Sequence, residues 1–326
     1  MSRAFAKPIV VVSKCLEFEA CRYNGERIAS SFIERLEPHV RFRPVCPEVE
    51  IGLGTPRDPI RIYSQGEQKA LFQPSTRKHL TRRMNAFSRR YLEGLEEVDG
   101  FILKAKSPSC AITDARIFPT PGSEEQIAQG AGLFAGAALE AFGSRAFVDE
   151  TGLSEPAARE NFLTRIFALA AFREVKESGR ADRLARYHAE NKLLFMAYDQ
   201  ETMREMGRVA ANHEKQTFGE AASAYESALL RLLTRSPTRA TWVNALTHAV
   251  GHLSEKVSAR DKARFLDAME EYREGKIPLG EPLEILREWI SRLGSEYLGK
   301  QTIFEPYPSV LGGQSRPALI CGVRSE

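Results

Sequence analysis

The sequence predicts an α/β domain with a mostly parallel sheet, followed by an all-α domain. Three observations lead to this prediction. Short apolar runs alternate with helical patterns through the first 150 residues, as in βαβ units. After Thr151 the strand patterns stop, and the periodicity stays helical to about Leu298. The length of 326 residues is sufficient for two domains that each have a core.

The first half contains predicted strands and helices in alternation. Each strand is a short run of apolar residues, many of them β-branched. The strands are expected at 9–12, 40–44, 60–63, 101–103 and 146–148, and the helices at 26–36, 76–95 and 124–142. Ser123 and Gln126 have the spacing of a capping box, which predicts that the third helix begins there.

The second half begins with a helical pattern from Glu155 to Val175 that has a strongly apolar face. Five or six further helices are expected before residue 300. The last residues are rich in proline and glycine and are predicted to run extended. The predicted domains are 1–150 (α/β), 151–178 (helical linker), 179–300 (all-helical) and 301–326 (extended tail).

Composition excludes several classes of protein. A hydrophobic content of 43% and a charged content of 27% exclude a disordered or fibrous chain. No apolar run reaches 18 residues and no signal-peptide pattern opens the chain, so we expect a cytoplasmic protein with no membrane partner. The five cysteines are an odd number and no secretion signal accompanies them, which disfavours a disulfide framework. None of them forms a CxxC pair, which disfavours a zinc ribbon or a ferredoxin-type cluster loop. We expect Cys321 to be a bystander.

Three cysteines follow predicted strands. Cys15, Cys46 and Cys110 each come shortly after an apolar run. Because the carboxyl ends of parallel strands form the ligand crevice of an open sheet, these thiols are expected to converge. Three thiolates are suitable ligands for a four-iron cluster or a zinc ion, with one metal position left open for substrate. The alternative is that they are small buried apolar residues.

Four blocks of sequence carry a resemblance to a known family. The blocks are Ser13-Lys-Cys15-Leu16, Cys21-Arg-Tyr-Asn-Gly25, Cys46-Pro-Glu48 and Ser107-Pro-Ser-Cys110. In this order they resemble the thiouracil desulfidase family. Residues 191–198 and 241–248 resemble the helical domain that is fused to that family. The two-domain form is similar to bacterial desulfidases that act on 4-thiouridine in tRNA.

The resemblance implies a 4Fe-4S cluster with one iron that has no protein ligand. Matched by motif, the three ligands are Cys15, Cys46 and Cys110. Cys21 lies in one of the blocks and is expected to be a neighbour of the cluster or an alternative ligand in place of Cys15.

The matched blocks also supply the expected catalytic residues, Glu48 and Ser107. In this hypothesis the open iron binds a thiocarbonyl sulfur as a Lewis acid, Glu48 accepts a proton from the attacking water, and Ser107 relays that proton. The reaction is then a hydrolysis. By themselves, Glu48 also fits the first turn of a helix and Ser107 fits a turn. The expected substrate contacts are Ser13, Tyr23, Arg57 and Ser109.

A basic stripe is predicted on the helix at 76–95. Its members are Arg82, Arg83, Arg89 and Arg90. Pairs seven residues apart lie on nearly the same helical face, about 10 Å apart, which suits the phosphates of an RNA backbone. A solvated charged face is the alternative. We expect tRNA that carries 4-thiouridine as the partner, with Tyr23 stacking on the extruded base, and we expect no DNA partner.

The predicted function is therefore iron-sulfur-dependent conversion of 4-thiouridine in tRNA to uridine. One alternative is a desulfidase that acts on free thiouracil or thiouridine nucleosides. Another is a non-catalytic RNA-binding or redox-sensing iron-sulfur protein. Outside these motifs, His248 and His252 have the i, i+4 spacing of a two-histidine metal face, although packing or capping is favoured because no third ligand follows.

Overall fold

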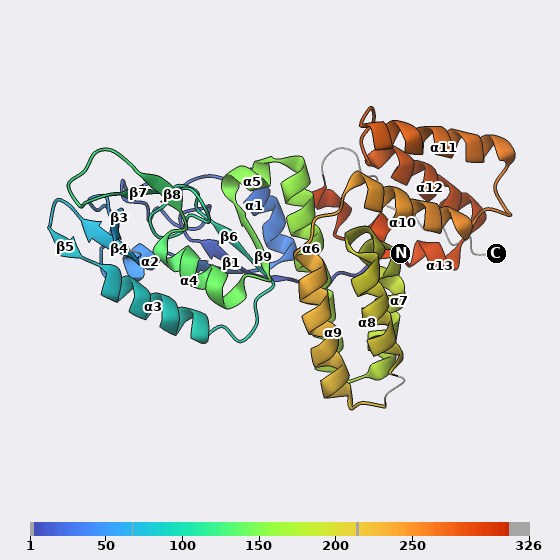
Figure 1. Cartoon of the computed structure of the whole chain (residues 1–326), viewed down its shortest axis with the longest axis horizontal. Helices are drawn as coiled ribbons and strands as arrows, with labels where there is room; N and C mark the ends of the chain where they lie inside the picture. The colour runs from blue at the N-terminus through green and yellow to red at the C-terminus, as the bar shows by residue number, and fades with distance from the viewer. Residues whose placement is uncertain (1–2, 67, 213–214, 313–326) are drawn as a thin grey trace. The chain divides into compact units, whose positions relative to one another are not determined.

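The computed structural model describes residues 3–66, 68–212 and 215–312 (Figure 1). Contacts divide the chain into two compact units. One unit comprises residues 7–166, and the other combines residues 3–6 with the described residues from Phe167 onward. The first is an α/β unit and the second is helical, which confirms the predicted fold class.

A four-stranded parallel sheet forms the centre of the α/β unit. Its strands, in spatial order, are β2 (Arg41–Val45), β1 (Ile9–Ser13), β6 (Gly100–Leu103) and β9 (Ala146–Asp149). All residues of β1 are buried, as expected for a strand with both faces covered. Ser13 pairs with Val45, and Leu103 pairs with Asp149, so the carboxyl ends of the strands share one edge.

A second, mixed sheet of five strands lies in the same unit. Its strands, in spatial order, are β5 (Lys78–His79), β4 (Gln68–Gln73), β3 (Arg61–Gln65), β7 (Ala115–Phe118) and β8 (Ala128–Gly130). The pattern at 60–63 predicts β3, whereas the other four strands were not expected. β5 and β8 are short and mostly polar, so the sequence gives only a weak strand pattern there.

The helices of the α/β unit pack on the parallel sheet. They are α1 (Ser31–Leu36), the 3-10 turn η1 (Glu37–His39), α2 (Pro47–Glu50), α3 (Thr81–Glu93), α4 (Leu133–Phe142) and α5 (Glu150–Ser154). Met84 and Phe87 of α3 share a buried cluster with Phe134 of α4 and Phe101 of β6. These two helices therefore cover the same face of the sheet.

The predicted start of α4 at Ser123 is wrong. The helix begins at Leu133, and the residues before it include β8. The Ser123 hydroxyl accepts a local hydrogen bond from the Glu125 N–H (3.2 Å) and caps no helix. Gly132 precedes the helix at a point where a Cβ atom would lie 2.5 Å from the Ser109 carbonyl carbon. The chain therefore enters α4 while pressed against the loop that carries Ser109.

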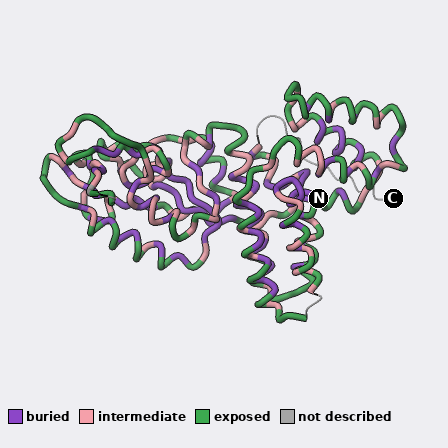
Figure 2. Tube along the Cα trace, viewed as in Figure 1, coloured by how far each residue is buried: buried purple, intermediate pink, exposed green. Residues whose placement is uncertain are grey.

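The helical unit is built from the second part of one long helix and the helices that follow it. Its helices are α6 (Pro156–Ser178), α7 (Ala181–Tyr198), α8 (Gln200–Ala211), α9 (Phe218–Leu233), α10 (Arg239–Gly251), α11 (Ala259–Glu274), α12 (Gly280–Leu293) and α13 (Glu296–Gly299). Buried and exposed residues alternate along most of these helices, whereas the last turns of α7 are buried throughout (Figure 2). The division of α7 from α8 was not expected. Asp199 separates the two helices, because its carboxylate caps α8 by accepting the Thr202 N–H (2.6 Å).

The boundary between the units differs from the predicted domain end at residue 150 and from the predicted linker at 151–178. It falls inside α6, between Ile166 and Phe167. The reason is packing, since Ile166 and Phe162 of α6 lie 2.7 Å and 3.2 Å from where a Cβ of Gly100 would stand. The first part of α6 therefore belongs to the α/β unit.

Residues 301–312 do not form the predicted extended tail. They contain the 3-10 turns η2 (Thr302–Phe304) and η3 (Ser309–Leu311), and Phe304, Tyr307 and Leu311 are buried. Gln301 accepts the Leu193 N–H (3.2 Å) and donates to the Ala189 carbonyl (2.8 Å), which ties this segment to α7. The rest of the predicted tail, with Cys321, lies outside the described residues.

The length and the hydropathy of a helix decide whether it can span a bilayer. A spanning helix needs about 20 mostly apolar residues. None of the helices in the described ranges is both long enough and apolar enough to meet this requirement.

Candidate functional site

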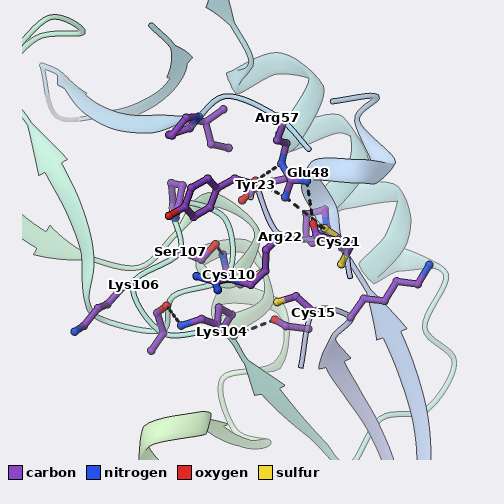
Figure 3. A pocket seen from close by; sticks show the side chains of 18 of the residues that line it. Cys15, Cys21, Arg22, Tyr23, Glu48, Arg57, Lys104, Lys106, Ser107 and Cys110 are labelled. Atoms are coloured by element: carbon purple, nitrogen blue, oxygen red, sulfur yellow. Dashed lines mark hydrogen bonds and ion pairs between the residues drawn. The ribbon is translucent and has the colours of Figure 1, made fainter. Parts of the chain in front are cut away.

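A pocket of about 460 Å³ lies at the carboxyl edge of the parallel sheet. Its lining comes from the loops that follow β1, β2 and β6, together with residues near β3 and β7. Figure 3 shows the labelled side chains around the hollow, with Glu48 beside Arg57 on one side and Lys104 near Cys15 on the other. The volume is within the range of small-molecule sites.

The structure brings all three predicted cysteine ligands to this pocket. Cys15, Cys46 and Cys110 line it, and so does Cys21. The four thiols are free, and all except Cys15 are buried. The described residues include no group of three or more His, Cys, Asp or Glu arranged to hold one metal ion. The ligands of a four-iron cluster need not surround one ion, because each thiolate binds a different iron atom.

Burial is the main influence on the pKa of two of these thiols. Loss of solvent, with a further contribution from Cys46, raises the pKa of Cys15 to about 12. Burial likewise raises the pKa of Cys110. Cys46 is the exception, because a hydrogen bond from the Cys21 thiol lowers its pKa to about 7. Thiols must lose their protons to bind a metal, so metal binding here would release protons.

Glu48 is held firmly at the pocket wall. It lies in the first turn of α2, as one reading of the sequence proposed, and its side chain still lines the pocket. Arg57 donates to Glu48 Oε2 from Nε (2.8 Å), and its Nη2 lies 2.8 Å from the same oxygen. Ser109 Oγ donates to Glu48 Oε1 (3.0 Å). Both oxygens of the carboxylate are therefore oriented by hydrogen-bond donors.

Ser107 shapes the loop that follows β6. Its Oγ accepts the N–H groups of Ser109 (3.2 Å) and Cys110 (3.1 Å), so the hydroxyl folds the chain back toward the pocket. Ser107 itself lines the pocket. The contact to Glu48 comes from Ser109, which had been expected to contact substrate. Ser109 is fully buried and does not line the pocket, so its hydroxyl reaches the pocket wall only through its hydrogen bond to Glu48.

The other predicted substrate contacts differ in their surroundings. Tyr23 lines the pocket and is 46% exposed, so its ring is accessible. Arg57 also lines the pocket, but its guanidinium group already donates hydrogen bonds to Glu48 and to the Cys21 carbonyl (2.9 Å). Ser13 is buried, and its Oγ accepts the Lys104 N–H (3.0 Å). Of these three side chains, Tyr23 is the one left open to a ligand.

Lys104, which lines the pocket, forms an ion pair that was not predicted. Lys104 Nζ lies 2.5 Å from Glu150 Oε1, and Glu150 Oε2 accepts the Ala105 N–H (2.9 Å). Glu150 directly follows β9, the fourth parallel strand. Its position at a strand end is the same signal that singled out the cysteines. The separation of 46 residues between the partners hid their contact.

The four arginines of the predicted basic stripe do not line this pocket. Arg82, Arg83, Arg89 and Arg90 are exposed on α3. Among the described residues, none of them forms an ion pair with a carboxylate.

Comparison with known proteins identifies the α/β half. A sequence model described as 2-thiouracil desulfurase matches residues 10–150. The protein YbbK of Bacillus subtilis (strain 168), described as uncharacterized, is 32% identical over 111 residues, which are 72% of YbbK and 31% of this chain. The chain belongs to the 2-thiouracil desulfurase family. All four cysteines of the pocket fall inside the region matched by the desulfurase model.

Other relatives extend the comparison. A second sequence model, described as a protein of unknown function (DUF1722), matches residues 192–308, so this member of the desulfurase family carries a second recognisable region. The protein YbgA of Escherichia coli (strain K12), described as uncharacterized, is 27% identical over 154 residues, 91% of YbgA and 47% of this chain. A solved structure described as the [4Fe-4S]-dependent thiouracil desulfidase TudS has a TM-score of 0.36 and 28% identity, and the match covers 46% of this chain and 95% of TudS.

The donor set of the pocket fits an iron-sulfur cluster. Thiolate is the usual protein ligand of such clusters. Four free thiols around one pocket exceed the three that the family resemblance requires. Histidine is absent from the pocket lining, which leaves sulfur as the soft donor.

Proposed function

We propose that this protein is a [4Fe-4S]-dependent desulfidase that removes sulfur from thiouracil. The observation that carries the proposal is the meeting of Cys15, Cys46 and Cys110 with Glu48 at one pocket. Membership of the 2-thiouracil desulfurase family supports the same activity. In the proposed reaction water replaces sulfur on the ring carbon, and the sulfur leaves as sulfide, so no external oxidant or reductant is needed.

Cys15, Cys46 and Cys110 would hold the cluster, with one iron left without a protein ligand. Cys21 would be their neighbour, since its thiol is hydrogen-bonded to Cys46. When bound, the cluster supplies a Lewis-acidic iron that attracts the thiocarbonyl sulfur.

The protein itself supplies the base and the means to orient it. Glu48 would accept a proton from the attacking water, because its carboxylate faces the pocket and is fixed by Arg57 and Ser109. Ser107 accepts two backbone N–H groups, which leaves its own O–H as a donor toward the substrate. The exposed ring of Tyr23 offers an apolar face for a pyrimidine.

The test is anaerobic reconstitution of the full chain with iron and sulfide, followed by incubation with 2-thiouracil and 4-thiouracil. We expect the near-ultraviolet absorbance of the thiocarbonyl to disappear and uracil and sulfide to form in equal amounts. A loaded cluster with no loss of that absorbance would overturn the proposed reaction and favour the non-catalytic, redox-sensing alternative. Absence of iron after reconstitution would overturn the proposed ligand set.

A second candidate substrate is 4-thiouridine within tRNA. Its support is the set of exposed arginines on α3, together with Lys106 and Arg116, which line the pocket and form no ion pair with a carboxylate among the described residues. Unpaired cations at a pocket attract phosphates. The variant Arg82→Glu/Arg83→Glu should slow desulfidation of thiolated tRNA and leave free thiouracil unaffected. Equal rates on tRNA for variant and wild type would remove α3 from this role.

A further inference from the structure

A second hollow, of about 500 Å³, lies in the helical unit. Its walls come from α7, α8 and α10, with Tyr297 of α13 at its border. All of its lining residues belong to the helical unit, and none lines the cysteine pocket. The proposed desulfidase chemistry makes no use of this hollow.

Three helices each present two basic or imidazole side chains to this hollow. The pairs are His188 and Lys192 on α7, Arg204 and Arg208 on α8, and His248 of α10 with His252, the C-cap residue of that helix. Every pair has the i, i+4 spacing that places two side chains on the same helical face. The two histidines that stood out in the sequence therefore belong to a larger basic cluster. Three cationic side chains and three imidazole rings thus lie around one hollow.

The cations of this cluster have no carboxylate partner within the described part of the chain. No Asp or Glu is among the lining residues of the hollow. Among the described residues, Lys192, Arg204 and Arg208 form no ion pair, whereas Arg231 of the same unit pairs with Glu205 of α8 (2.6 Å). A hollow lined by one sign of charge concentrates ions of the opposite sign.

The imidazole groups are fixed by packing. His188 Nδ1 lies 3.1 Å from the Tyr225 hydroxyl, and its Nε2 lies only 2.9 Å from where a Cβ of Gly207 would stand. Glycine at 207 therefore allows α7 and α8 to approach across the His188 ring. The His252 ring lies against Tyr297, with ring centroids 4.6 Å apart. Tyr297 is 39% exposed, so this aromatic pair offers a flat surface at the border of the hollow.

We propose that the basic hollow of α7, α8 and α10 is a binding site for the phosphate group of a nucleotide or an RNA strand. Guanidinium groups suit phosphate because their donors match two phosphate oxygens at once. The Tyr297 and His252 rings would receive the attached base by stacking. A simple carboxylate would bind the cations but would have no group to stack on the aromatic pair, so the pair favours a phosphate that is attached to a base. The proposal does not depend on the desulfidase activity.

Titration calorimetry on the full chain tests this site, with uridine 5′-monophosphate, inorganic phosphate, uridine and unmodified tRNA as probes. The variant Arg204→Glu/Arg208→Glu reverses two exposed charges in the hollow. The matched control is Lys256→Glu/Arg260→Glu, which makes the same change of net charge at exposed positions outside the hollow. A second variant, Lys192→Gln, removes one exposed charge from α7. Circular dichroism and thermal melting confirm that each variant is folded.

We expect the wild type to bind the phosphate-bearing probes and not uridine. The α8 variant should weaken that binding by at least about tenfold, Lys192→Gln by a smaller factor, and the control by less than about twofold. Binding of the monophosphate would identify a nucleotide site, and binding of tRNA alone would identify an RNA backbone site. The proposal is overturned if no phosphate-bearing probe binds, if uridine binds equally well, or if both double variants weaken binding equally.

Discussion

Ser109 Oγ donates a hydrogen bond of 3.0 Å to Glu48 Oε1, although 61 residues separate them in the chain. The contact joins the loop after β6 to the short helix after β2. Arg57 binds the other oxygen of the same carboxylate. Glu48 is therefore oriented from two sides, which is the preorganisation that a general base requires.

Replacing Glu48 with Gln should lower the turnover of thiouracil by about 10² to 10⁴-fold, the usual contribution of a general base. The iron content should stay at the wild-type value, because Glu48 is not among the proposed ligands. Steady-state kinetics and iron analysis measure the two effects. Glu50→Gln changes an exposed carboxylate of the same helix and should leave turnover unchanged. Wild-type turnover in Glu48→Gln would assign the base to another residue.

Ser109→Ala should lower turnover by about tenfold, because a hydrogen bond to a charged group contributes about 1.5 to 3 kcal/mol. Its effect acts through Glu48, so the double variant Glu48→Gln/Ser109→Ala should be little slower than Glu48→Gln alone. Kinetics of the two single variants and the double variant measure this coupling. If the two losses multiply, Ser109 acts independently of the carboxylate.

Serine substitution should separate the cluster ligands from their neighbour. Cys15→Ser, Cys46→Ser and Cys110→Ser should each lose most of the roughly four iron atoms expected per chain, since each removes a thiolate ligand. Cys21→Ser is the matched control at the same pocket and should keep its iron. Iron analysis and visible absorbance after anaerobic reconstitution measure the outcome. Iron retained in Cys15→Ser but lost in Cys21→Ser would show that Cys21, and not Cys15, is the cluster ligand.

Gly132→Ala should destabilise the protein by about 1 to 3 kcal/mol, because the new Cβ would overlap the Ser109 carbonyl. It should also slow turnover, since the displaced loop carries the Ser109 contact to Glu48. Gly136→Ala is the control within α4, where the nearest atom is 3.8 Å away, and it should stabilise the helix by about 0.5 to 1 kcal/mol. Urea unfolding measures both changes. Equal stability of the two variants would contradict the close approach at Gly132.

The stability of the protein should fall as the pH drops from about 6.5 to about 4. Burial, assisted by the charge of Lys192, lowers the pKa of His188 to about 4, whereas a histidine in the unfolded chain has a pKa near 6.5. Across this window the unfolded state takes up a proton that the folded state does not. The free energy of unfolding therefore decreases on acidification, by at most about 3 kcal/mol.

Removal of the buried imidazole should reduce that dependence. His188→Gln should flatten the decrease, and His248→Gln, at an exposed position, should not. Urea unfolding at a series of pH values gives the slopes. The same slope for His188→Gln and wild type would show that other groups cause the acid sensitivity.

The centre of the parallel sheet could be predicted because β1 and β6 are short continuous apolar runs that are fully buried. The mixed sheet could not, because strands such as β5 and β8 are held by their neighbours and not by an apolar pattern of their own. The start of α4 was misplaced because a capping pattern at Ser123 competed with the tertiary contact at Gly132.

The cysteines of the site could be predicted because they all follow strands that end at the same edge. The pairing of Lys104 with Glu150 depends on the side-by-side placement of β6 and β9, which no local pattern encodes. The partner of Glu48 was also missed, since Ser107 and Ser109 have the same residue type and only the folded loop distinguishes them.

The passage of one helix, α6, through the boundary of the two units limits how this protein can be shortened. A fragment that stops at residue 150 would lack Phe162 and Ile166, and the surface around Gly100 would lose its apolar cover. A fragment that stops after Ile166 keeps that cover but ends within a helix. A fragment with the α/β unit alone should therefore include the whole of α6. The apolar residues of its second part, which the helical unit buries in the full chain, should be replaced with polar ones.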